Sequence, residues 1–155
     1  MGLDMYLTKS HYIGAKYDFR NIKGIIDVSD DKGKYPINFN KVMSIREDAM
    51  YWRKANAIHQ WFVDNVQDGE DNCAEYYVPY EDLVRLRDLC IEVKNDMSKA
   101  EEPLPTQDEF FFGSTEYGEW YEADLDYTIE GLTKLIDEYD EYPDHRPEYY
   151  YSSSW

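Results

Sequence analysis

The chain has 155 residues, and its 33 acidic side chains outnumber its 16 basic side chains to give a formal net charge of −17. Apolar residues make up 43% of the chain and aromatic residues 17%, which excludes a disordered chain and predicts one domain with a core. No apolar run is long enough to span a bilayer. Residues 1–9 lack the features of a secretory signal, and two cysteines make no disulfide framework, so we expect a cytoplasmic protein.

The acidic excess is concentrated in the last third of the chain. Residues 1–100 hold 17 acidic and 14 basic side chains, whereas residues 101–155 hold 16 acidic and 2 basic ones. Direct binding of nucleic acid is not expected here, because phosphate contacts need positive charge. The expected partners are basic protein surfaces, including surfaces that themselves bind nucleic acid. The alternative is that the charge serves only to keep the protein in solution.

The first half of the chain predicts a strand, a hairpin and a long helix. Leu3, Met5 and Leu7 alternate with polar residues, which is typical of a half-buried strand. Residues 25–28 and 35–39 flank a polar loop and predict a β-hairpin. Apolar residues recur at helical spacing over residues 41–66 and predict one long helix or two joined end to end.

The second half predicts two short strands, two helices and an irregular end. Strands are predicted at residues 74–78 and 109–112, and amphipathic helices at residues 81–97 and 119–139. Residues 141–155 are rich in tyrosine and serine without a helical or strand period, and we expect an irregular tail. The predicted fold is therefore α+β: a single globular domain over residues 1–140, with a small mixed or antiparallel sheet packed against about three helices.

The predicted helix at residues 119–139 carries acidic residues on the face opposite its leucines. Like charges four residues apart each cost a few tenths of a kcal/mol, about the size of the gain from an opposite pair. Only Lys134 offers local relief along this helix. We interpret the face as a candidate surface for binding a protein partner, and the alternative is an ordinary solvated face. Its residues are Glu119, Glu122, Asp126, Glu130 and Asp137, and Glu116, ahead of the helix, extends the candidate partner-binding surface.

A second candidate site surrounds His59, which falls near the centre of the apolar face in a helix over residues 51–69. A buried imidazole needs hydrogen-bond partners, and a tyrosine hydroxyl or a backbone carbonyl would make it a core residue. The alternative is a pocket that binds a small molecule or supports acid–base chemistry. Its candidate residues are Asp4, Arg53, Asn56, His59, Gln107, Ser114 and Thr115.

The sequence contains no motif that assigns an enzymatic reaction. Phosphate-binding glycine loops and a nucleophile elbow are absent from it. Its three histidines and two cysteines lack the spacing of metal ligands, so neither a metal nor a cofactor is expected. These absences favour an interaction protein over an enzyme.

Three segments resemble a group of small bacteriophage and prophage proteins of unassigned function. The segments are MGLDMYL at 1–7, YWRKANAIHQWFVDNVQDG at 51–69 and LPTQDEFFFGSTEYGEWY at 104–121. The resemblance implies a phage setting in the cytoplasm of a host cell. In that setting an acidic protein is expected to act as a DNA mimic that inhibits a host-defence nuclease, such as a CRISPR effector. A homodimer formed through the aromatic tail is a further possibility.

Overall fold

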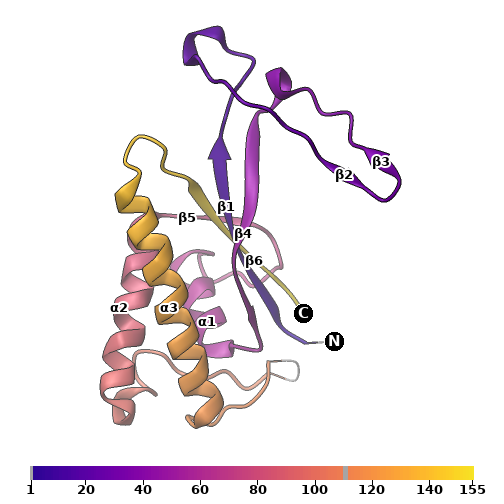
Figure 1. Cartoon of the computed structure of the whole chain (residues 1–155). Coiled ribbons are helices and arrows are strands. Elements are labelled where there is room, and N and C mark those ends of the chain that lie inside the picture. The colour runs from indigo at the N-terminus through magenta and orange to yellow at the C-terminus, as the bar shows by residue number, and fades with distance from the viewer. Residues whose placement is uncertain (1, 110–111) are drawn as a thin grey trace.

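A computed structural model describes residues 2–109 and 112–155 of the chain. Its centre is a four-stranded antiparallel sheet with the strand order β4-β1-β6-β5, packed against three helices (Figure 1). The strands are β1 (Asp4–Tyr12), β4 (Ser44–Arg53), β5 (Tyr76–Val78) and β6 (Glu148–Ser154). The helices are α1 (Asn56–Asn65), α2 (Tyr80–Asn95) and α3 (Glu119–Glu141). The protein therefore has the α+β fold that the sequence predicts.

The sheet buries one face and leaves the other open. Leu3, Met5 and Leu7 are fully buried, as their alternation predicts, whereas Tyr6 between them is exposed. The antiparallel register places Met5 beside Trp52 of β4 on one side and Ser153 of β6 on the other. These neighbours share one face of the sheet, and that face carries the core.

The prediction of one helix over residues 41–66 is wrong for its first half. Residues 44–53 form strand β4, which pairs with β1 along its whole length, and only residues 56–65 are helical. Met50 and Trp52 are buried while Tyr51 and Arg53 are exposed, so the alternation of a strand applies here. Lys54, at a φ of 59°, lies between the strand and the helix. Pairing with a distant strand outweighed the local helical spacing.

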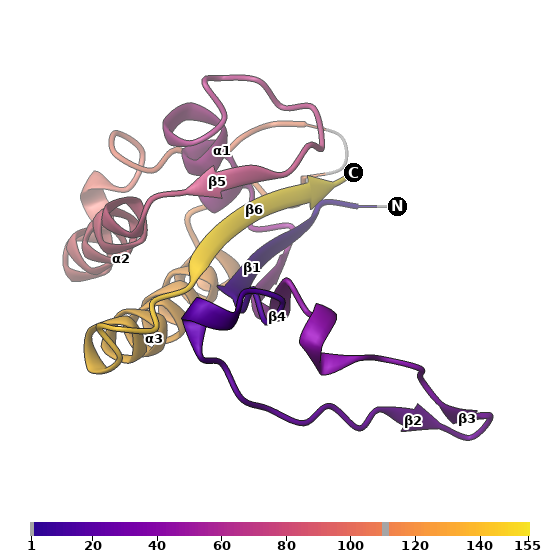
Figure 2. The ribbon, with the colours of Figure 1, turned by 90° about the horizontal axis from the view of Figure 1, so that it is seen from above.

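The prediction of an irregular tail over residues 141–155 is also wrong. Residues 148–154 form β6, which lies between β1 and β5 (Figure 2). Tyr149, Tyr151 and Ser153 are buried and alternate with more exposed residues. Because tyrosine favours strands, the segment has a clear reason to pair. Tyr149 and Tyr151 therefore belong to this chain's own core.

The hairpin is present, although its strands are shorter than predicted. Strands β2 (Ser29–Asp30) and β3 (Gly33–Lys34) pair inside the predicted loop, and one more backbone hydrogen bond joins Tyr35 N to Val28 O at 2.8 Å. Three 3-10 helices complete the described elements: η1 (Asp18–Arg20), η2 (Phe39–Lys41) and η3 (Met97–Lys99).

The other predicted elements agree with the structure, with one exception. Strand β5 and helices α2 and α3 form within two residues of their expected limits, and α2 packs against α3. Of the strand predicted at residues 109–112, Glu109 and Phe112 lie outside any strand, and residues 110–111 lie outside the described residues. Within the described part of the chain, no helix is long and apolar enough to cross a membrane.

Candidate functional site

A cavity of about 500 Å³ opens between the start of α1, the loop over residues 104–116 and the first turns of α3. Its apolar walls come mainly from Ile58, Leu104, Tyr121 and Leu125. Trp120 lies at this cavity with 81% of its surface exposed. Polar side chains complete the lining, and they are Arg53, Lys54, Asn56, Thr106, Ser114, Glu116 and Asp124.

Hydrogen bonds of the Asn56 side chain join the 104–116 loop to the start of α1. Its Nδ2 group donates to the carbonyl oxygens of Phe112 and Ser114, each at 3.0 Å, and its Oδ1 atom accepts from the amide of Gln107 at 2.9 Å. The buried amide thus has partners for both donor hydrogens and for its oxygen. Asn56 shapes the cavity wall, and its polar atoms are already committed to the loop.

Lys54 has a left-handed backbone, with a φ of 59°, at the edge of the cavity. Few residues other than glycine adopt this conformation. For a residue with a long side chain, this backbone conformation costs on the order of 1–3 kcal/mol. Gly113 has a φ of 92° and packs on Lys54, so that a Cβ atom there would lie 3.1 Å from the Lys54 Cβ. The strained turn and the close packing hold the Lys54 side chain at the rim.

Asp124 is a titratable residue of the cavity, and burial changes the pKa of its carboxyl group. Burial raises the pKa of the Asp124 carboxyl to about 6 from its ordinary value of 3.8. Its position on α3 explains this, because it lies three residues after Tyr121 and directly before Leu125, both of which are buried. Perturbed carboxyl groups in cavities are typical of ligand-binding and catalytic sites.

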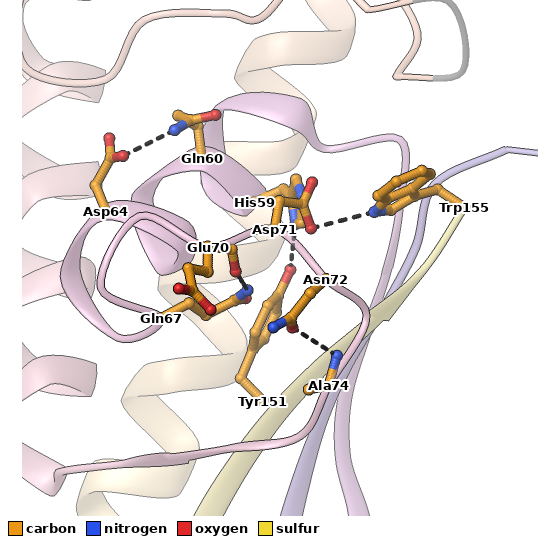
Figure 3. Close-up of polar contacts among 10 residues, drawn as sticks. All are labelled: His59, Gln60, Asp64, Gln67, Glu70, Asp71, Asn72, Ala74, Tyr151 and Trp155. Carbon is orange, nitrogen blue, oxygen red and sulfur yellow. Dashed lines mark hydrogen bonds and ion pairs between the residues drawn. The ribbon is translucent and has the colours of Figure 1, made fainter.

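His59 lies outside this cavity, in a buried hydrogen-bond chain (Figure 3). Its ring is fully buried, with Nδ1 2.7 Å from the Tyr151 hydroxyl and Nε2 2.8 Å from an oxygen of Asp71. The carboxylate can only accept, so we assign the ring proton to Nε2 and the Tyr151 hydroxyl as the donor to Nδ1. Trp155 Nε1 donates to the other oxygen of Asp71 at 3.1 Å. His59 is thus a core residue bonded to a tyrosine hydroxyl, one of the two roles that the sequence left open.

The pocket predicted around His59 and Asn56 is therefore only partly assembled. Arg53 and Asn56 line the cavity, as does Ser114. Gln107 and Thr115 belong to the wall loop and contribute backbone hydrogen bonds to it. Asp4 accepts a hydrogen bond from the Tyr51 hydroxyl, away from the cavity.

Among the cavity residues that were absent from the predicted pocket are Lys54, Trp120 and Asp124. Asp124 was recognisable, because it lies off the acidic face of the helix and among core positions. The left-handed backbone of Lys54 and the exposure of Trp120 could not be predicted, because no sequence pattern indicates either of them.

The acidic face of α3 is present, but lysines neutralise part of it. Glu116, Glu119, Asp126, Glu130 and Asp137 are exposed, and Glu122 is half-buried. Lys94 of α2 bridges Glu122 at 3.1 Å and Asp126 at 3.0 Å, and Lys134 pairs with Glu130 at 2.9 Å. Lys134 is the local partner that the sequence indicates on this helix, and the packing of α2 adds Lys94 as a second one. The hydrogen bonds that Lys94 Nζ donates to Asp126 and Glu122 raise the pKa of Lys94.

The chain matches no protein-family model, no curated protein and no solved structure. Over residues 2–109 and 112–155, no group of three or more histidine, cysteine or acidic side chains is placed to hold a metal ion.

The buried chain around His59 gives a prediction for two neighbouring tyrosines. Replacing Tyr151 with phenylalanine keeps its stacking on Phe62 but leaves His59 Nδ1 buried without a partner, so we expect a loss of about 1–3 kcal/mol. In the control, Tyr150→Phe, the lost hydrogen bond to Glu148 is solvent-exposed, and the loss should stay below about 0.5 kcal/mol. Urea unfolding measures both values. Equal losses would contradict the role given to Tyr151.

The raised pKa of Asp124 gives a prediction for stability against pH. The folded protein holds this proton up to about pH 6, whereas the unfolded chain releases it near 3.8. Ionisation of Asp124 therefore lowers the free energy of unfolding of wild type progressively as the pH rises from about 4 to about 6. Above pH 6 the loss of stability stays constant. Asp124→Asn removes the effect, so its gain in melting temperature should grow between about pH 4 and pH 6 and then level off. A gain that is independent of pH would contradict the burial of this carboxyl.

Proposed function

We propose that the protein binds a small molecule in the cavity between α1, the 104–116 loop and α3. The observation that supports this most is the cavity itself, whose volume of about 500 Å³ lies within the range of ligand sites. Mainly apolar walls with a few polar groups are typical of such sites. The strained backbone at Lys54 and the perturbed carboxyl of Asp124 lie at the same cavity, where function accounts for both.

The lining favours a planar ligand that carries a negative charge. The exposed indole of Trp120 offers a flat face on which a ring can stack. Arg53 and Lys54 supply positive charge at the cavity, in a chain whose net charge otherwise repels anions. Ala57 and Ile58 also line it, and their amides at the start of α1 have no backbone acceptor among the described residues. Asp124 would exchange a proton with a polar group of the ligand.

Thermal-shift screening followed by calorimetry tests this proposal. The compounds are nucleoside phosphates and aromatic carboxylates, and we expect at least one to raise the melting temperature. Trp120→Ala should weaken its binding about tenfold or more, because stacking contributes roughly 1–3 kcal/mol. Lys54→Gly should also weaken binding while relieving the strained backbone, so the fold is kept.

A matched control separates binding from backbone effects. Asn21 has the same left-handed backbone, with a φ of 54°, but is exposed and outside the cavity, so Asn21→Gly should leave affinity unchanged. If no compound in these two classes binds, or if both cavity variants bind as tightly as wild type, the proposal is wrong.

The second candidate function is that of an acidic interaction protein in the cytoplasm of a host cell. Its support is the acidic face of α3. Glu119 and Asp137 on the helix, and Glu116 in the loop before it, are exposed and form no ion pair within the described part of the chain. A helix of 23 residues is about 35 Å long, which lets its carboxylates span a groove that ordinarily holds phosphates. We infer that such a protein would act as a DNA mimic toward a basic host protein, for example a defence nuclease or CRISPR effector.

Capture of host proteins on the immobilised chain tests the second candidate. Reversing Glu116, Glu119 and Asp137 to lysine should release a nucleic-acid enzyme that wild type retains. A control with the same change of charge, made at the exposed residues Glu70, Glu101 and Glu102, should still retain it. Raising the salt from about 0.1 to 1 M shortens the screening length from about 10 to 3 Å and should elute the enzyme. Retention by the α3 variant, or no captured nucleic-acid enzyme, would exclude this function.

A further inference from the structure

Residues 13–43 connect β1 to β4 and form a long extension, here called the arm. The arm contains η1, β2, β3 and η2, and in both views it reaches beyond the end of the sheet and away from the helices (Figures 1 and 2). At its base, the amides of Ile13 and Gly14 donate to Met43 O, and Ala15 N donates to Val42 O. These bonds join the two ends of the arm to each other, and Arg20 Nη2 donates to Tyr12 O of β1 at 3.4 Å.

The arm has no core of its own. No residue from 15 to 49 is buried, although every one of them is described. Ile25 is 94% exposed and Phe19 is 84% exposed, and Val28, Tyr35, Ile37 and Met43 are also exposed. A two-stranded hairpin alone is at best marginally stable in water, because no buried surface offsets the entropy lost on ordering it. Exposed apolar side chains gathered in one segment are typical of an interaction surface.

The charge of the arm is opposite to that of the rest of the molecule. The arm holds six basic and four acidic side chains, so its net charge is +2. The other residues hold 10 basic and 29 acidic side chains, so their net charge is −19. The acidic part of the molecule outside the arm would repel a nucleic acid. A second copy of the chain instead offers an acidic surface that attracts the arm.

The acidic face of α3 supplies both kinds of group that the arm needs. Its carboxylates can pair with the lysines of the arm. Trp120 and Tyr127 on the same helix are 81% and 46% exposed, and they offer apolar surface for Phe19 and Ile25. In a two-fold dimer each arm meets the same surface of the other copy, so both arms are covered at once.

We propose that the protein forms a homodimer in which each arm packs on the α3 face of the second copy. The dimer does not rest on ligand binding in the cavity. It uses the arm and the α3 face, whereas the possibility considered from the sequence used the C-terminal tail, which is part of the sheet. A basic host partner, if one binds α3, would compete with the arm.

Light scattering coupled to size-exclusion chromatography tests the dimer on the full chain. We expect a mass of twice 18.5 kDa for wild type. The double variant Phe19→Ser/Ile25→Ser should raise the dimer dissociation constant at least tenfold, and Lys23→Glu/Lys32→Glu should do the same by reversing charge. These side chains are exposed, so far-UV circular dichroism should be unchanged. The control Ile91→Ser/Tyr142→Ser removes exposed apolar surface elsewhere and should leave the dimer intact.

Cross-linking locates the contact. Wild-type chains with and without ¹⁵N are mixed and treated with a carbodiimide, which joins lysines to carboxylates in direct contact. We expect links between arm lysines of one isotope and α3 carboxylates of the other. A monomer at every concentration, a dimer unaffected by both arm variants, or links only within one chain would overturn the proposal. Binding of single-stranded nucleic acid by the arm in place of a second copy would also overturn it.

Discussion

The pairing of β1 with β6 is the constraint on which the rest of the structure depends. It joins residues 4–10 to residues 148–154, and it gives β1 a partner on each side. Strand β6 also holds β5 and supplies Tyr151, whose hydroxyl satisfies the buried ring of His59. Because α3 leads into β6, the same pairing determines where the long helix lies against α2. The cavity and the acidic face both follow from that position.

The sequence predicts well those elements whose apolar pattern has one period only. Leu3, Met5 and Leu7 have a clean period of two, and the core residues of α2 and α3 have a clean helical spacing. Residues 44–53 are harder because Ala49 and Trp52 fit a helix, while Met50 and Trp52 fit a strand. The choice between them is made by β1, which lies more than thirty residues away, so no local rule could decide it. The C-terminal strand was missed for a related reason, since three consecutive tyrosines followed by three consecutive serines show no alternation of apolar and polar residue types.

The candidate site was predictable in its region but not in its composition. Asn56 lies at the cavity, but its amide is used to hold a loop, and His59, three residues further along α1, belongs to a different network. Helical spacing predicts which residues share one face of a helix, but it does not predict which other segment of the chain packs on that face. Asp124 shows the converse, because its helical position among core residues sets it apart from the acidic face, while its place at the cavity depends on the packing of the whole chain. The pairing of Lys94 with the acidic face depends on the packing of α2 against α3. The sequence of α3 alone does not predict that packing.

The antiparallel join between β1 and β6 has a consequence for how the protein is made. Strand β1 emerges from the ribosome before β4, which can then pair with one of its edges. The other edge of β1 has no partner until residues 148–154 appear, which at about 5–20 residues per second takes on the order of 10 s. During that time the apolar half-sheet lacks its neighbouring strand, and for most of it the half-sheet also lacks the complete helix α3. The nascent chain is therefore most vulnerable to aggregation before synthesis has passed residue 154, and chaperones that shield unpaired strands would act in that interval.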